Sequence, residues 1–207
     1  MNQVSRYRFA AALAAIASFG AAAAIAGGAT DGYSHLQLPL GLLGAKQLGA
    51  VGVVFGLFAF FLPGLVGAWI ALQLRQVLPQ HSAWSLRIGS QLALLAALAF
   101  AAQALFPLDL EGLDVGSSRW HALAWLLWVV AFPCAGVLLG AGMWSQPGAR
   151  TFALASLLAG SVVLLGGFLG SGWLGAALSQ RVAFAAWLLW GAVASLPHGQ
   201  SVSRGAA

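Results

Sequence analysis

Long apolar stretches alternate with short polar segments along this chain. Stretches of about 20 apolar residues are long enough to cross a hydrocarbon core of about 30 Å as a helix. The pattern predicts six such spans, at residues 9–27, 47–72, 88–106, 120–143, 151–170 and 181–196. The apolar runs are continuous rather than alternating, which argues against a membrane β-barrel. The predicted fold is therefore an all-α, polytopic bundle of six transmembrane helices that forms one domain over residues 1–207.

The sixth span is the shortest, and a semi-apolar segment at residues 171–180 precedes it. This segment is expected to be either a short interfacial helix or an extension of the span. Pro63-Gly64 lies inside the second span and Pro133 inside the fourth, and both prolines are expected to kink their helices.

Three pairs of glycines spaced four residues apart are candidates for close helix contacts, because small residues let helices approach in lipid. The pairs are Gly52 with Gly56, Gly136 with Gly140, and Gly166 with Gly170. Polar side chains inside the spans are expected to make hydrogen bonds between helices. They are Gln91, Gln103 and Ser161.

The basic residues indicate the orientation of the bundle. If the N-terminus is cytoplasmic, six basic residues lie inside: Arg6, Arg8, Arg75, Arg87, Arg150 and Arg204. Only three lie outside, namely Lys46, Arg119 and Arg181. This excess predicts that both termini are cytoplasmic. The first span also resembles a secretory signal, but an intact first helix gives the even number of spans that this orientation requires.

Composition supports the membrane class, with 61% hydrophobic and 6% charged residues and a mean hydropathy of +0.90. The net charge of +5 comes from scattered basic residues at the ends of spans, so nucleic-acid binding is not expected. The expected partner is the lipid bilayer, with a lipid or a small polar molecule as a possible ligand. The sequence does not predict the oligomeric state, the substrate or a cofactor.

The ionisable residues gather on the predicted outer side, where all four carboxylates of the chain lie, at Asp31, Asp109, Glu111 and Asp114. Ionisable groups near the membrane are costly and are functional candidates for that reason. Asp109, His121 and Arg181, each at the end of a predicted span, are the candidate catalytic residues and are expected to lie close together. The candidate ligand-binding residues are Asp31, His35, Lys46, Gln180 and Trp125.

Several functions fit this set of residues. His121 is a possible general base that Asp109 orients. Asp31, His35, Asp109 and His121 are possible ligands of zinc or iron. Arg181 and Lys46 are possible partners of an anion or a lipid headgroup. Alternatively, Arg181 pairs with Asp109 in a structural network, or the chain is a regulatory partner without chemistry or a transporter. Haem is disfavoured because His81 and His198 are predicted to lie in cytoplasmic loops.

Short motifs spread over most of the chain resemble a bacterial family of six-helix membrane proteins, catalogued as domain of unknown function 998. They are Asp31-Gly-Tyr-Ser-His35, Leu42-Leu-Gly-Ala45, Pro63-Gly64, Phe106-Pro-Leu-Asp109, His121 with Ala124, and Gln180-Arg181 before Trp190. The resemblance implies a six-helix integral membrane protein, and we expect the protein to lie in a bacterial inner membrane. It implies no particular reaction.

Overall fold

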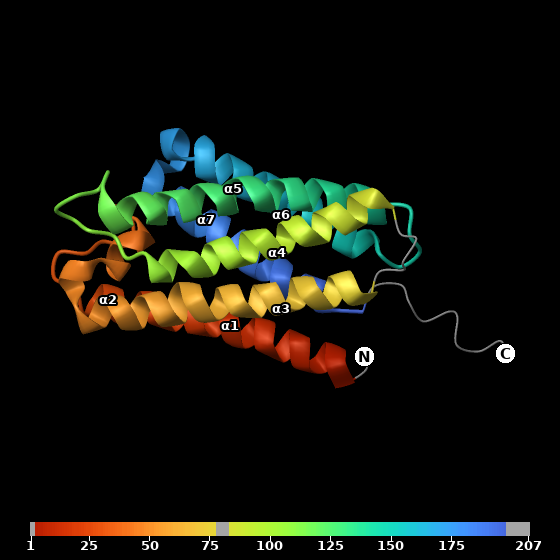
Figure 1. Ribbon diagram of the computed structural model, residues 1–207, viewed down its shortest axis with the longest axis horizontal. Coiled ribbons are helices and arrows are strands. Elements are labelled where there is room, and N and C mark those ends of the chain that lie inside the picture. Colours follow the sequence, from red (N-terminus) through yellow and green to blue (C-terminus); the bar gives the residue numbers. More distant parts are fainter. Residues whose placement is uncertain (1–2, 78–82, 198–207) are drawn as a thin grey trace.

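A computed structural model describes residues 3–77 and 83–197 of the chain. Within these residues, six helices are long and apolar enough to cross a membrane, which confirms the predicted all-α, six-span fold. They are α1 (Gln3–Gly28), the second span Ala50–Gln76, α4 (Trp84–Leu105), α5 (Gly116–Met143), α6 (Arg150–Phe168) and α7 (Ser171–Ala194) (Figure 1). His81, His198 and Arg204 lie outside the described residues.

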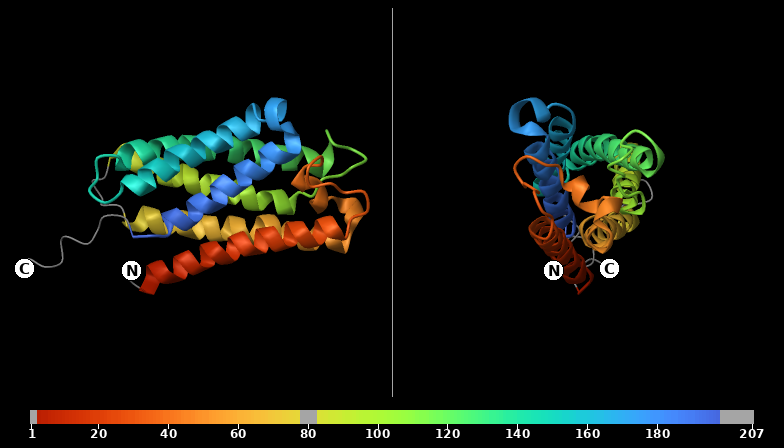
Figure 2. Two further views of the ribbon diagram at one scale, coloured as in Figure 1. Left: turned by 180° about the vertical axis from the view of Figure 1, so that it is seen from behind. Right: turned by 90° about the vertical axis from the view of Figure 1, so that its left-hand side faces the viewer.

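The spans form a closed ring in which α1 contacts both the second span and α7 (Figure 2). Aromatic side chains fill its centre because every span contributes apolar surface there. The Phe100 ring lies 5.3 Å from the Phe60 ring and 5.2 Å from the Phe184 ring, and Trp128 lies 5.3 Å from Phe184. All four side chains are buried, so they define the core of the bundle.

Two of the predicted glycine pairs lie where helices meet. A Cβ atom on Gly136 would collide with the backbone oxygen of Ser156 in α6, and one on Gly166 would meet the backbone oxygen of Ser179 in α7 at 2.9 Å. These contacts need glycine because no side chain fits between the backbones. In the third pair, Gly52 packs under the backbone of Ala45 and Gly56 packs against Ala104 of α4.

The sixth span begins earlier than predicted, because helix α7 already starts at Ser171. Its first turn is separated from the rest by Gly175, which has a positive φ of 75°. Glycine adopts this conformation without strain. The semi-apolar segment is therefore an extension of the span that bends at Gly175.

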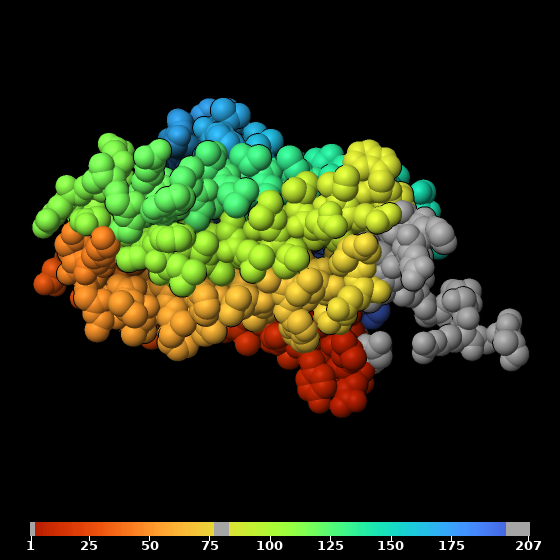
Figure 3. Space-filling model, viewed as in Figure 1, coloured from red at the N-terminus to blue at the C-terminus, as the bar shows by residue number. Residues whose placement is uncertain are grey.

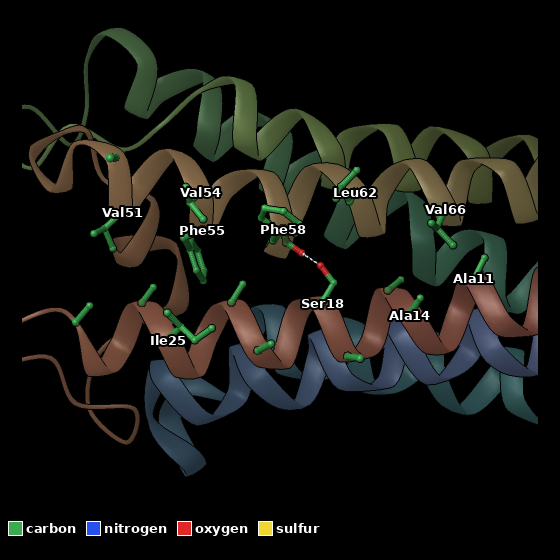
Figure 4. A pocket seen from close by; sticks show the side chains of 17 residues that line it. Ala11, Ala14, Ser18, Ile25, Val51, Val54, Phe55, Phe58, Leu62 and Val66 are labelled. Atoms are coloured by element: carbon green, nitrogen blue, oxygen red, sulfur yellow. Dashed lines mark hydrogen bonds between the residues drawn. The ribbon is translucent and has the colours of Figure 1, made fainter.

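The second span is irregular near Pro63. It consists of α2 (Ala50–Phe55), a π-helical segment η3 (Gly56–Phe61) and α3 (Leu62–Val77). The Leu62 N–H donates to the Leu57 oxygen, which is five residues earlier. The same register would pair the Phe58 oxygen with residue 63, but proline has no N–H. The Ser18 hydroxyl of α1 donates to this Phe58 oxygen instead, at 2.7 Å (Figure 4).

The contact between Ser18 and Phe58 can be tested against the proline that creates the need for it. Ser18→Ala leaves a backbone oxygen without its donor, which costs roughly 1–3 kcal/mol where no water replaces the donor, as at an apolar surface in detergent or lipid. Pro63→Ala supplies an N–H for the same oxygen. We therefore expect Ser18→Ala to lower the thermal unfolding midpoint in detergent strongly in the wild type and weakly in the Pro63→Ala background. Equal losses in the two backgrounds would contradict this account.

Candidate functional site

The loops between α1 and α2 and between α4 and α5 meet at one end of the bundle (Figures 1 and 3). The first loop contains two short 3₁₀ helices, η1 (Leu40–Gly44) and η2 (Lys46–Leu48). The Lys46 N–H donates to the Leu108 oxygen at 2.8 Å and so joins the two loops. Every predicted site residue except Trp125 has its side chain in or beside these loops or at the nearby bend of α7.

Asp109 is held by its neighbours in the two loops. Its carboxylate accepts a hydrogen bond from the Gln47 amide at 2.8 Å and pairs with the Lys46 ammonium at 3.4 Å. Its backbone N–H donates to the Ser118 hydroxyl at 2.8 Å. The bond from Gln47, then the Glu111 N–H and the Lys46 charge, lower the pKa of the Asp109 carboxyl below its usual value. We call Lys46, Gln47, Asp109 and Ser118 the Asp109 latch.

Arg181 belongs to a second group, which ties the first loop to α7. Its guanidinium donates to the Leu38 oxygen at 3.1 Å and to the Tyr33 hydroxyl at 2.8 Å, and it lies 3.3 Å from His35 Nδ1. The neighbouring Gln180 accepts a hydrogen bond from the Leu40 N–H at 2.7 Å. We call Tyr33, His35, Gln180 and Arg181 the clasp. The clasp fixes the start of η1 against α7.

His121 has neither of these roles. Its Nδ1 lies 3.1 Å from the Gln103 oxygen and 3.0 Å from the Phe106 oxygen. Carbonyl oxygens only accept, so Nδ1 carries a proton and donates to both. The Gln103 oxygen needs this donor because its helical partner would be the N–H of residue 107, which is Pro107. In the neutral ring, Nε2 is then an acceptor.

His121 also lines a cavity of about 270 Å³. Lys46, Phe60, Gln103 and Pro107 also line this cavity, together with backbone at Gly44, Ala45, Gly49, Gly52 and Gly56. Lys46, Gly49 and Val53 are exposed at its rim. We call it the polar cavity.

Gln103 is the unusual residue of the polar cavity. Its side chain is 1% exposed, and neither its Oε1 nor its Nε2 has a hydrogen-bond partner among the described residues. Most buried polar groups in proteins have a partner, and an unsatisfied one costs roughly 1–3 kcal/mol. The predicted interhelical hydrogen bond of Gln103 is therefore wrong, and its amide is an unsatisfied polar group in the wall of the cavity. Gln91 and Ser161 are exposed rather than placed between helices.

The structure corrects several expectations. Asp109 pairs with Lys46 and not with Arg181, and His121 is oriented by two carbonyl oxygens and not by Asp109. Among residues 3–77 and 83–197, no three His, Cys, Asp or Glu side chains gather to hold a metal, so the four proposed metal ligands do not form one cluster. Asp31 is exposed in a turn. Trp125 packs on Trp128 at 5.1 Å, as part of the aromatic core.

Comparison of the chain with protein-family models, curated proteins and solved structures found no match. The resemblance drawn from the sequence motifs therefore stays a prediction. The evidence on function comes from the geometry of the site itself.

The separate partners of Asp109 and Arg181 lead to a prediction about their coupling. Residues that share no partner contribute independently to stability. Asp109→Asn removes an exposed ion pair and should lower the unfolding midpoint only slightly. The combination of Asp109→Asn and Arg181→Gln should lower the unfolding midpoint by the sum of the two single effects. Recovery of the unfolding midpoint in the double variant would instead support an ion pair between Asp109 and Arg181.

The stability that the clasp provides should fall at high pH, because the Tyr33 phenol then ionises. Burial raises the pKa of the Tyr33 phenol, although the Arg181 guanidinium opposes this. The folded state thus favours the neutral phenol. The stability that this preference gives is present at neutral pH and is lost as the pH rises through the raised pKa of Tyr33. Tyr33→Phe should cost about 1 kcal/mol at neutral pH, the worth of one hydrogen bond.

Above pH 10, the difference in unfolding midpoint between wild type and Tyr33→Phe should shrink. Tyr7→Phe is the control, because the Tyr7 side chain is 61% exposed. A difference that stays constant with pH, or one that Tyr7→Phe reproduces, would rule out this role of Tyr33.

Proposed function

We propose that this protein binds a small hydroxylated molecule, or the hydroxylated headgroup of a lipid, in the polar cavity. The observation that carries the proposal is the buried, unpartnered amide of Gln103. This amide offers one acceptor and two donor hydrogens, and His121 Nε2 offers an acceptor. A hydroxyl group both donates and accepts, so it complements these atoms.

The size of the polar cavity supports a small ligand. Its volume of about 270 Å³ lies just below the roughly 300–1,000 Å³ that is typical of sites for drug-sized molecules. It corresponds to roughly nine water molecules at about 30 Å³ each. At the exposed rim the Lys46 ammonium is already paired with the Asp109 carboxylate, so the rim does not select for an anionic ligand.

We place the polar cavity at the extracytoplasmic face of a bacterial inner membrane, with both termini in the cytoplasm. The support for this orientation is the excess of basic residues at the opposite end. Membership of the six-helix family that the motifs resemble is part of the same proposal. An acid–base reaction has less support, because the His121 ring is held by carbonyl oxygens and has no carboxylate partner among the described residues.

A structural or regulatory role is the second candidate. The observation in its favour is that Arg181 and Asp109 are both fully engaged in tying loops together. Under this alternative the polar cavity holds only water, and the purified protein carries no ligand there.

Replacement of Gln103 distinguishes the two candidates. Gln103→Leu keeps the approximate size of the side chain and removes both unsatisfied polar atoms. If the polar cavity is a binding site, this variant should retain or gain thermal stability and lose bound ligand by about tenfold or more, as expected for losing hydrogen bonds worth about 1.4 kcal/mol or more. Gln91→Leu is the matched control, because Gln91 lies on the same helix and is exposed.

The measurement is native mass spectrometry of the purified protein, followed by extraction of the bound species. A species in the organic phase identifies a lipid, and one in the aqueous phase identifies a small molecule. A wild-type protein without any bound species, or equal retention in Gln103→Leu and Gln91→Leu, would contradict the proposal.

A further inference from the structure

A second, larger cavity lies between α1 and the span formed by α2, η3 and α3 (Figure 4). Its volume is about 1010 Å³, and its lining is apolar except for Ser18. The Ser18 hydroxyl is already bound to the Phe58 oxygen. We call this cavity the α1 groove. It therefore offers no polar group to a ligand and fits only an apolar occupant.

The α1 groove lies within the membrane-spanning part of the protein. Its lining on α1 runs from Ala11 to Ala26, about 22 Å at the 1.5 Å rise of a helix, and continues to Ala29 just after the helix ends. This length covers most of the roughly 30 Å of the hydrocarbon core. The side chains on α1 that face the groove are mostly alanines, so they leave space that larger residues would fill.

Arg8 lies at the N-terminal end of the same part of α1. It precedes Ala11 and Ala15, which line the groove, by three and seven residues, a spacing that keeps residues on one side of a helix. The Arg8 side chain is only 9% exposed, and its Nε has no hydrogen-bond partner among the described residues. A guanidinium with a buried, unpartnered Nε is costly inside a membrane, so an anionic group is expected beside it.

The length of α1 places Arg8 at the level of lipid headgroups. The helix has 26 residues, or about 39 Å, and so exceeds the hydrocarbon core by about 9 Å. The predicted span begins directly after Arg8, at Phe9. A phosphate at this level meets the guanidinium, which is the side chain best suited to bind it.

We propose that the α1 groove and Arg8 together bind one phospholipid with an anionic headgroup, its phosphate at Arg8 and an acyl chain in the groove. This lipid site is separate from the polar cavity, because no residue lines both of them. The charge of Arg8 favours a lipid over a second copy of the chain, because an apolar helix would leave the guanidinium without an anion.

The test is native mass spectrometry of the delipidated full-length protein with equal amounts of phosphatidylglycerol and phosphatidylcholine. Wild type should retain phosphatidylglycerol in preference. Arg8→Gln should weaken that preference by about tenfold, the effect of losing one charge-assisted hydrogen bond, and Arg8→Lys should keep most of it. Arg6→Gln is the matched control, because Arg6 is exposed on the same helix.

A second pair of variants tests the acyl chain. Ala14→Leu places a larger side chain in the groove and should reduce retention of both lipids, whereas Ala24→Leu, exposed outside the groove, should not. Unfolding midpoints near that of wild type confirm that the variants fold. Equal losses in Arg6→Gln and Arg8→Gln, no effect of Ala14→Leu, or a dimer that Ala14→Leu disrupts would each overturn the proposal. None of these outcomes involves Gln103, so they leave the polar cavity untouched.

Discussion

Backbone carbonyl oxygens that lack an N–H partner inside a membrane determine much of this structure. Lipid offers no hydrogen bonds, so each such oxygen must find a donor within the protein. Pro63 leaves the Phe58 oxygen without a donor, and Ser18 of α1 supplies one. Pro107 does the same to the Gln103 oxygen, and His121 of α5 supplies the donor. In both cases a proline leaves a carbonyl oxygen unbonded, and the side chain that donates to this oxygen links a neighbouring helix to the proline-containing segment.

The polar cavity follows from the second of these attachments. Because His121 Nδ1 is committed to the carbonyl oxygens at the end of α4, the ring is fixed in the wall of the cavity and only its Nε2 is left to bind a ligand. The side chain of Gln103 lines the same cavity from α4. An amide side chain is costly within a membrane unless it has a hydrogen-bond partner. The π-helical segment contributes Gly56 and Phe60 to the wall. The irregular parts of the second span and of α4 therefore build the site together.

The sequence predicted the spans well and the contacts poorly. Hydrophobic length depends only on local composition, so all six spans could be located. The segment at residues 171–180 was expected to be an interfacial helix or an extension of the span, but its bend at Gly175 was not predicted. Which charges meet depends on how loops fold over the end of the bundle. Asp109 was expected to meet Arg181. Instead, the hydrogen bond from the Lys46 N–H brings the loop of Lys46 against the loop of Asp109, and Arg181 donates to Leu38 and Tyr33.

Gln103 was recognised as polar within a span, but its role was misjudged, because a glutamine at that position more often bonds to another helix. The signal that could have identified the site was the spacing of four between Gln103 and Pro107, which leaves a carbonyl without its donor. Tyr33, Gln47 and Ser118 were missed because a single hydroxyl or amide side chain in a loop or at the start of a helix carries little information by itself.

The most direct test of this account is an experimental density map of the protein in a lipid nanodisc, at a resolution that separates ligand from water. The account predicts density within hydrogen-bond distance of both the Gln103 side-chain amide and His121 Nε2, with His121 Nδ1 facing the carbonyl oxygens of Gln103 and Phe106. A map in which the Gln103 amide turns to a protein partner and the polar cavity is closed would contradict it.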